Sequence, residues 1–297
     1  MSRVSEWRRL APVYGYRSVD ALARAIPAPI ADRLAAGVMR SASSRLGERS
    51  AVVRAHMRRV LGPGATDETI ERAAQLCFAA YGRYWAEAFR IPTLTRAELD
   101  AGMQWEGLVH VEHALQQGKG AMLTMPHIGG FDWGGAWFAA SGYPATVVAE
   151  SLQPPELFAF FKTLREGFGL EVVELGEAAG AAILRRLRTN GLVGLVCDRD
   201  IAGTGAEVEL FGFPTTIPAG PATLALRTGA AILPCAVYFE DDGMHRGVVR
   251  PPLDVDRTGS LRDDVQRITQ AMANEFENLI RVAPEQWHVL QPNWPDL

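Results

Sequence analysis

The spacing of apolar residues divides the chain into two parts. Up to about residue 105 these residues recur at helical spacing. In the first helix they are Val4, Trp7, Leu10, Ala11 and Tyr14. Thr66, followed by two acidic residues, predicts the start of another helix. We therefore expect residues 1–105 to form a basic helical segment that packs on an α/β core of residues 106–297.

After Met103 short apolar runs alternate with helical stretches. The runs at 121–125, 145–149, 171–175 and 192–197 predict buried strands, and those at 206–210, 231–240 and 247–250 predict more. Helices are expected near 131–140, 155–168, 178–188 and 261–282. This alternation is typical of the α/β class, with a central, mostly parallel or mixed β-sheet flanked by helices.

Composition indicates a folded protein without a membrane span. Of the 297 residues, 48% are hydrophobic and 22% are charged, which is close to a globular domain. No apolar run approaches the roughly 20 residues that cross a bilayer, and no signal peptide is apparent, so we expect a cytoplasmic location. The three cysteines, Cys77, Cys197 and Cys235, lie in apolar runs without paired spacing. Reduced core thiols are expected, with no metal and no disulfide.

Charge is concentrated at one end of the chain. The whole chain has a net charge of −4, but its first 60 residues carry twelve arginines against four acidic residues. A basic helix with Trp and Tyr at its apolar boundary favours an anionic membrane surface over nucleic acid. The protein is then peripheral, on the cytoplasmic face of the plasma membrane. Alternatively, the helix packs on the core and its arginines are merely solvated.

Candidate chemistry follows the strand predicted at 121–125. Pro126 ends that strand and leaves His127 at its tip, where α/β proteins bind ligands. Asp132, five residues on, is a candidate partner that would orient the imidazole for proton abstraction. The backbone amides of Gly129 and Gly130 are oxyanion candidates on position alone. Alternatively, Asp132 caps the following helix and His127 makes only a structural hydrogen bond.

Three stretches carry a resemblance to a known family. They are His-x-x-x-x-Asp at 127–132, the run at 211–222 with its continuation at 225–230, and Pro-Glu-Gln-Trp-His-Val-Leu-Gln-Pro at 284–292. Together they resemble the bacterial lipid A late-acyltransferase family of the glycerolipid acyltransferase superfamily. The similarity is greatest to its actinobacterial branch, which acylates phosphatidylinositol mannosides, and spans about residue 10 to the C-terminus. A Phe-Pro-Glu-Gly-type motif of the glycerol-phosphate branch is absent, which disfavours a lysophosphatidic acid substrate.

The resemblance implies acyl transfer from acyl-CoA, a co-substrate, to a sugar hydroxyl of a glycolipid, without a cofactor. It also implies that Glu150 and Arg165 face the acceptor or the catalytic pocket. Arg165 would suit a phosphate, whereas Glu150 is alternatively a plain helix-start carboxylate. Asp198, Arg199 and Asp200 follow the fourth strand, at the edge where the acceptor would lie. Their alternative is a solvated turn.

In the expected mechanism His127 activates the acceptor hydroxyl, and no acyl-enzyme forms. No Gly-x-Ser-x-Gly elbow is present to supply a nucleophile. Trp133, Trp137 and Phe138 either line an apolar groove for the acyl chain or belong to ordinary core. Three alternatives stay open: an acyl-CoA thioesterase, a non-catalytic lipid-binding protein, and a metal-dependent hydrolase, for which no third ligand is evident.

Overall fold

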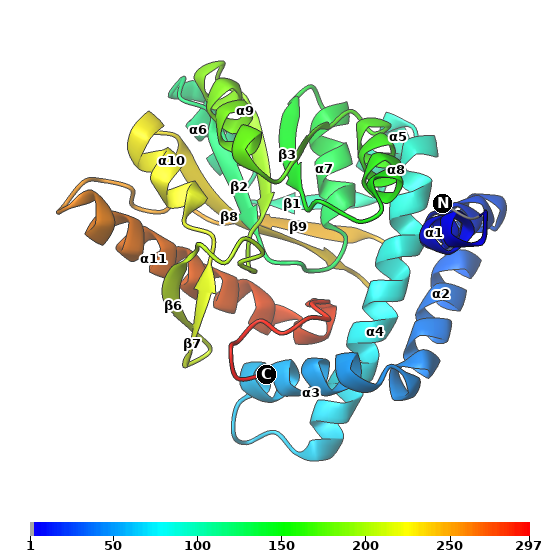
Figure 1. Ribbon diagram of the computed structural model, residues 1–297. Coiled ribbons are helices and arrows are strands. Elements are labelled where there is room, and N and C mark those ends of the chain that lie inside the picture. Colours follow the sequence, from blue (N-terminus) through cyan, green and yellow to red (C-terminus); the bar gives the residue numbers. More distant parts are fainter. Residues whose placement is uncertain (1–2) are drawn as a thin grey trace.

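A seven-stranded β-sheet forms the centre of the protein, and the α/β class expected from the sequence is confirmed (Figure 1). The computed structural model describes the backbone from Arg3 and the side chains from Arg8 to the C-terminus. The strands are β1 (Met103–Glu106), β2 (Ala121–Met125), β3 (Ala145–Ala149), β4 (Glu171–Glu174), β5 (Leu192–Val196), β8 (Ala231–Phe239) and β9 (His245–Val249). Of these, β1 was not expected from the sequence, and it crosses the boundary expected between residues 105 and 106.

The strand order β1-β9-β8-β2-β5-β3-β4 places β2 between β5 and β8. All neighbours are parallel except β8 and β9, which are antiparallel. Parallel neighbours end at the same edge of a sheet. The residues that follow β2 and β5, far apart in the sequence, therefore meet at one edge.

The central strands are apolar throughout because both faces of the sheet are covered. In β2, Met122 joins the core cluster on one face and Leu123 the cluster on the other. In β5, Val193 and Leu192 divide in the same way. Because side chains alternate along a strand, a continuous apolar run supplies two cores at once.

Helices cover each face. Those packed on one face are α5 (Arg96–Ala101), α6 (Val109–Gln116), α7 (Phe131–Ala140) and α8 (Pro155–Glu166). The other face is covered by α9 (Glu177–Arg188), α10 (Gly220–Thr228), α11 (Leu261–Val282) and the hairpin of β6 (Ala206–Leu210) and β7 (Phe213–Ile217). The helices expected in α7, α8, α9 and α11 are confirmed.

The N-terminal part is helical, as expected. It contains α1 (Arg3–Ala25), α2 (Ala28–Ala42), α3 (Gly47–Leu61) and α4 (Asp67–Arg90), with 3₁₀ turns η1 (Ser43–Arg45) and η2 (Ile91–Thr93). The Thr66 side chain accepts a hydrogen bond from the amide of Thr69, so the helix start predicted there is confirmed. In Figure 1, α4 runs past the sheet edge and carries α1 and α2 on its outer side.

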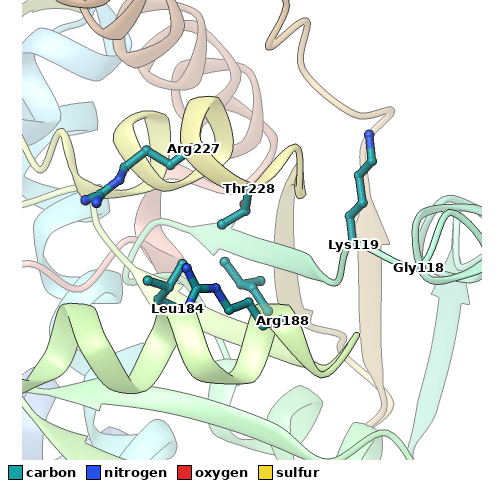
Figure 2. Close-up of a pocket in the computed structure, with 7 residues that line it drawn as sticks. Gly118, Lys119, Leu184, Arg188, Arg227 and Thr228 are labelled. Atoms are coloured by element: carbon teal, nitrogen blue, oxygen red, sulfur yellow. The ribbon is translucent and has the colours of Figure 1, made fainter.

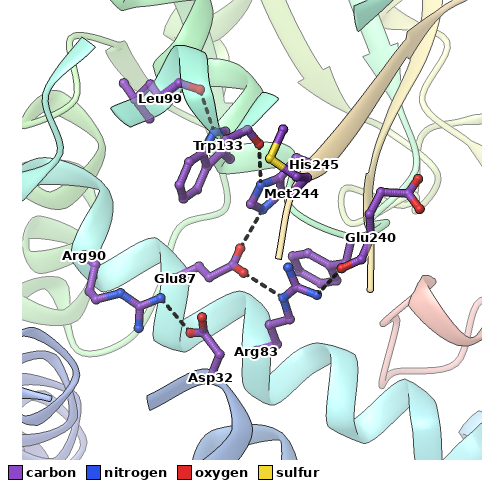
Figure 3. A network of polar contacts seen from close by, with 12 residues as sticks. Asp32, Arg83, Glu87, Arg90, Leu99, Trp133, Glu240, Met244 and His245 are labelled. Carbon is purple, nitrogen blue, oxygen red and sulfur yellow. Dashed lines mark hydrogen bonds and ion pairs between the residues drawn. The ribbon is translucent and has the colours of Figure 1, made fainter. Parts of the chain in front are cut away.

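A buried polar network fastens α4 to the sheet (Figure 3). Glu87 of α4 accepts hydrogen bonds from His245 Nε2 at 2.8 Å and from Arg83 at 2.7 Å. The ring of Trp133 stacks on His245 at 4.3 Å between centroids. Burial would raise the pKa of Glu87, but the His245 and Arg83 charges outweigh it and hold the pKa below its ordinary value. The network thus joins the helical layer to the core.

The first helix lies partly against the core. Val13 is buried, and Leu10 packs on the same cluster. Arg9 pairs with Glu156 of α8 through two contacts of 2.8 Å, and Arg24 pairs with Asp20. The side chains of Arg3, Val4 and Trp7, which the expected membrane face includes, lie outside the described residues.

Exposed large apolar side chains nevertheless concentrate on α1 and α2, where six of them lie. The outer patch, as we call it, consists of Tyr14, Val19, Leu22, Ile30, Leu34 and Val38, each about half or more exposed. Residues 30, 34 and 38 follow one another at one-turn spacing along α2. Between residues 3 and 297, no helix combines the length and apolarity needed to cross a bilayer.

Candidate active site

His127 stands in a loop that the C-terminal segment clamps against the sheet edge. Its carbonyl accepts a hydrogen bond from the amide of His288 at 3.0 Å, and Ile128 forms a β-bridge with Trp287. This segment follows α11 and contains the turn η3 (Pro284–Gln286). The stretch at 284–292 therefore acts as a support for the histidine loop.

The partner of His127 is Asp198, the second residue after β5. The Nδ1 atom of His127 lies 2.6 Å from Asp198 Oδ1. The other carboxylate oxygen accepts the backbone amide of His127 at 2.9 Å and the indole N–H of Trp287 at 2.7 Å. Because β5 neighbours β2, the two strand ends bring these residues together across 71 positions of sequence.

Burial and hydrogen bonding have opposite effects on the pKa of Asp198. The side chain of this residue is completely inaccessible to solvent. Burial by itself would raise the pKa of this carboxyl. The adjacent imidazole and the hydrogen bonds from His127 and Trp287 outweigh burial and hold the pKa below its ordinary value. Asp198 is therefore an ionised carboxylate. Because its side chain is completely buried, it is not part of a solvated turn and does not contact an acceptor directly.

The Asp198 carboxylate fixes the orientation of the His127 imidazole. A hydrogen bond from Nδ1–H to an ionised carboxylate fixes the tautomer in which Nε2 has a free lone pair. The His127 side chain is 27% exposed and lines a large cavity. Nε2 forms no hydrogen bond with any residue between 8 and 297. This arrangement leaves one ring nitrogen of His127 able to accept a proton from a group in the cavity.

The pairing of Asp132 with His127 expected from the sequence is wrong. Asp132 lies in the first turn of α7, and its carboxylate receives two hydrogen bonds from Arg165 of α8, at 3.0 and 3.1 Å. The Tyr84 hydroxyl donates a third at 2.7 Å. The turn after β2 directs this side chain toward α8. Asp132 does not cap α7 either, since no side-chain cap is formed there.

Gly129 and Gly130 are not positioned as oxyanion donors, so this expectation is also wrong. The amide of Gly129 donates to the Gln286 carbonyl and that of Gly130 to the Val237 carbonyl. Gly129 has φ +54°, and a β-carbon there would lie 2.0 Å from the Val237 oxygen. These glycines allow the loop to approach β8 closely.

A cavity of about 920 Å³ opens beside His127. Part of its wall is apolar and comes from the sheet and the helices beside it, with Leu123, Phe138, Val147, Phe161, Leu170 and Val237. Tyr16 of α1, Arg49 of α3 and Tyr81 of α4 line the cavity from the helical segment. The N-terminal helices therefore form part of the candidate site.

The remaining predicted site residues have different surroundings. Glu150 and Arg199 line the cavity, and their side chains form no ion pair with another described residue. Asp200 also lines it, but its carboxylate accepts the amides of Thr204 and Gly205 and so stabilises a turn. Arg165 lines the cavity from within its ion pair with Asp132, so its guanidinium is already engaged.

The aromatic residues expected to line an acyl groove separate into two groups. Phe138 lines the cavity. Trp133 stacks on His245 and donates to the Leu99 carbonyl, and Trp137 packs against Trp105. Both tryptophans thus belong to the core, which was the alternative to an acyl groove in the sequence analysis. No group of three or more His, Cys, Asp or Glu placed to hold a metal occurs in the part of the chain that the structure describes.

The sequence was also compared with known families. The sequence model of the bacterial lipid A biosynthesis acyltransferase family matches residues 5–295. The chain belongs to this family. The resemblance inferred from its motifs is thereby confirmed, and the protein is an O-acyltransferase.

Individual relatives agree with this assignment. The phosphatidylinositol mannoside acyltransferase of Mycolicibacterium smegmatis is 37% identical over 285 residues, which cover 94% of this chain and 90% of the relative. The protein of the same name from Mycobacterium tuberculosis is 41% identical over 249 residues, 82% of this chain and 76% of the relative. The lipid A biosynthesis acyltransferase of Haemophilus influenzae is 24% identical, over 76% of this chain and 69% of the relative.

The sequence did not identify Trp287 of this acyltransferase as a site residue, although Trp287 lies in the 284–292 stretch that carries part of the family resemblance. Replacing Trp287 by phenylalanine keeps a buried ring and removes the N–H that holds Asp198. We expect kcat to fall about tenfold, or about 1.4 kcal/mol, with KM unchanged, because a loosened carboxylate orients the base less well. Steady-state kinetics measure both constants.

The matched control is Trp294→Phe. Trp294 is similarly buried and contacts the Trp287 ring, but its indole N–H has no partner among the described residues. Its kcat should stay within about twofold of the parent. Equal losses in both variants would mean that ring packing, and not the hydrogen bond to Asp198, sets the rate.

Proposed function

We propose that this acyltransferase moves a long acyl chain from a coenzyme A thioester to a mannose hydroxyl of a phosphatidylinositol mannoside, with His127 as general base. The observation that carries the mechanism is the contact of His127 with a completely buried carboxylate on one side and with the cavity on the other. The acceptor is inferred from the names of the mycobacterial relatives.

The reaction needs one base and no covalent intermediate. His127 Nε2 takes the proton of the acceptor hydroxyl as its oxygen attacks the thioester carbonyl carbon. The tetrahedral intermediate then collapses, the carbon–sulfur bond breaks, and the imidazolium returns its proton to the leaving thiolate. Asp198 stabilises the imidazolium between these two transfers.

The cysteines do not supply a nucleophile. Cys77, Cys197 and Cys235 are free and buried, and burial raises the pKa of the Cys235 thiol to about 12. A thiol with a raised pKa is inert at neutral pH. Direct attack by the acceptor hydroxyl therefore suits the residues present.

We assign the two substrates to different walls of the cavity. Its apolar wall suits the acyl chain, since it removes methylene groups from water. Arg49 and Arg199 line the cavity without an ion pair to another described residue, and we assign the acceptor phosphate to them in place of Arg165.

Product analysis by mass spectrometry tests this function. Purified protein is given palmitoyl-CoA with phosphatidylinositol mannoside, a lipid A precursor or lysophosphatidic acid. We expect one added palmitoyl group on the mannoside only. Acylation of lysophosphatidic acid instead would contradict the proposed acceptor.

Two rival functions give different results. A thioesterase would consume palmitoyl-CoA at the same rate with or without the mannoside, whereas the proposed enzyme consumes it faster when the acceptor is added. A lipid-binding protein would release no coenzyme A at all. Among these functions, only acyl transfer makes coenzyme A release depend on the acceptor.

We also propose that α1 and α2 attach the enzyme to an anionic membrane through the outer patch. Moving the apolar side chains of this patch from water into the membrane surface stabilises the bound state. Arginines between them attract anionic lipid, and each contributes about 1 kcal/mol. Tyr16 of α1 lines the catalytic cavity, so the same helix would join the membrane to the site. A lipid acceptor would then enter beside α1.

Replacing Ile30, Leu34 and Val38 together by glutamine should weaken binding to anionic vesicles by at least tenfold, because transfer of such a side chain from water contributes roughly 1.5–3 kcal/mol. Vesicle sedimentation measures this. Activity on vesicle-embedded acceptor should fall in parallel, while activity on detergent-dispersed acceptor is kept.

The matched control replaces three exposed apolar residues outside the patch, Val109, Leu261 and Val282. A second series changes Arg8, Arg17 and Arg24 to glutamine and should weaken binding most at low salt, where charges are least screened. Binding that is equal for neutral and anionic vesicles and unaffected by the patch substitutions would show that α1 and α2 serve only to pack on the core.

A further inference from the structure

A second, smaller cavity of about 290 Å³ lies beside the last turns of α9 and α10 (Figure 2). Its lining includes three basic residues, Lys119, Arg188 and Arg227, whose side chains point in different directions. This arrangement does not point to one ligand that all three would contact. The apolar wall that suits an acyl chain belongs to the larger cavity, beside His127.

One face of α7 lines this larger cavity. Phe131, Gly134, Gly135 and Phe138 are among the lining residues, and positions three and four apart lie on the same face of a helix. The ring of Phe131 lies 6.0 Å from the ring of His127, measured between centroids. This face of α7 therefore begins beside the proposed base, and it carries two glycines between two phenylalanines.

The lining residues of the sheet extend away from His127. His127 follows the end of β2, whereas Ala145 begins β3 and Leu170 directly precedes β4. Because β2, β5, β3 and β4 are parallel neighbours, their starts lie at the opposite edge of the sheet from His127. β2 has five residues and spans about 16 Å. An extended chain advances about 1.2 Å per bond, so an acyl chain that begins at His127 reaches this edge after about a dozen carbon atoms.

The two glycines of α7 have different surroundings. Glycine inside a helix is unfavourable relative to alanine, so each needs a structural or functional reason. A β-carbon on Gly134 would lie 2.7 Å from Cγ2 of Val237, so the packing of α7 on β8 requires glycine there. A β-carbon on Gly135 would meet only the Leu170 side chain, with its nearest methyl carbon at 3.3 Å. Packing would therefore allow a methyl group at 135 after a small shift of Leu170.

We propose that Gly135 sets the length of the acyl chain that the enzyme accepts. The missing side chain leaves space beside Leu170, where the carbon atoms beyond about the twelfth would lie. This rests on the proposed function, which places the acyl chain against the apolar wall. A larger side chain at 135 would fill this space and admit only shorter chains.

The first test replaces Gly135 by leucine and compares palmitoyl-CoA with decanoyl-CoA, whose chain ends before this space. We expect the ratio of kcat/KM for palmitoyl-CoA to kcat/KM for decanoyl-CoA to fall at least tenfold, because added methylene groups compete with the longer chain for an apolar site. Gly135→Ala adds a single carbon atom and should lower the ratio by a smaller factor. Equal losses with both donors in the two variants would overturn the proposal.

The matched control is Gly37→Ala, assayed with detergent-dispersed acceptor. Gly37 lies inside α2, a β-carbon there would meet nothing within 4 Å, and the residue lines neither cavity. The ratio between the two donors should stay unchanged. A shift as large as that of Gly135→Ala would mean that a more stable helix, and not space in the cavity, changes the preference, and the role of Gly135 would be wrong.

Binding of the donors separates this proposal from the proposed function. Isothermal titration with palmitoyl-CoA and decanoyl-CoA, below their micellar concentrations and without acceptor, needs no transfer. In Gly135→Leu we expect the Kd for palmitoyl-CoA to weaken at least tenfold more than the Kd for decanoyl-CoA. This result in a protein that proves not to transfer acyl groups would keep the role of Gly135 and reject the function. Acyl transfer by a Gly135→Leu protein with an unchanged chain preference would keep the function and reject the role of Gly135.

Discussion

Replacing His127 by alanine is expected to lower kcat by roughly 10²–10⁴-fold, the usual contribution of a positioned general base. His127 contacts the cavity, and its imidazole is held by a completely buried carboxylate. No other histidine combines these two properties among residues 8–297: His288 also lines the cavity, but its Nε2 lies 3.1 Å from the Gly129 carbonyl and burial lowers its pKa to about 4. The measurement is the initial rate with palmitoyl-CoA and phosphatidylinositol mannoside.

The fold should survive this substitution, because the His127 side chain is partly exposed and the loop is held by backbone hydrogen bonds. The circular dichroism spectrum and the unfolding transition of the variant check this. His113→Ala is the matched control, since His113 lies exposed on α6 and lines neither cavity. Near-normal turnover in a folded His127→Ala protein would remove the proposed base.

Replacing Asp132 by alanine is expected to destabilise the protein by about 3–5 kcal/mol, the typical cost of leaving one member of a buried ion pair without its partner. The Asp132 and Arg165 side chains are only 6% and 17% exposed. In the parent protein burial favours the neutral form of Arg165, but Asp132 and Tyr84 outweigh it and hold the pKa of the guanidinium above its ordinary range. Removing Asp132 takes away the larger of these two contributions and leaves a buried guanidinium without its counter-charge. Urea unfolding followed by circular dichroism measures the free energy of unfolding.

Two further variants make this result specific. Asp132→Leu combined with Arg165→Met removes both charges and should recover much of the lost stability. Asp100→Ala breaks the exposed Arg96–Asp100 pair on α5 and should cost less than about 1 kcal/mol. If Asp132→Ala kept its stability and lost only turnover, Asp132 would act on the reaction itself, and the structural role derived from its contacts would be wrong.

The two ends of the His-x-x-x-x-Asp motif are therefore expected to have different roles. His127 faces the cavity from the loop, while Asp132 has already entered α7 and points toward α8 and α4. In holding Arg165 and Tyr84, Asp132 joins three helices that line the cavity. A short motif therefore combines the proposed base with the ion pair that holds the surrounding helices together.

A second buried His–carboxylate pair shows why residue types alone do not identify the site. His245 and Glu87 are as closely paired as His127 and Asp198, at 2.8 and 2.6 Å. However, both side chains are almost wholly buried and neither lines the cavity. The chemical difference between the two pairs is access to substrate, which only the packing of α4 and α7 decides.

Local patterns were sufficient for the fold class and for the strand that carries His127. Buried strands are apolar on both faces, and helices repeat every 3.6 residues. The local pattern alone therefore predicted a strand at 121–125 and a helix at 261–282. A proline after such a strand marks its end, which located His127 at the sheet edge. The strand β1 was not predicted, because it has only four residues and its apolar positions show no clear periodicity.

Pairing between distant residues was decided by the tertiary structure. The sequence places a carboxylate at 132 and another at 198, and spacing favoured the nearer one. The strand order sets β5 beside β2, and so Asp198, not Asp132, meets His127. Likewise, the amides of Gly129 and Gly130 are engaged because β8 and the C-terminal segment pack on their loop. Periodicity is a property of neighbouring residues, whereas a hydrogen-bond partner depends on which elements the whole core brings side by side.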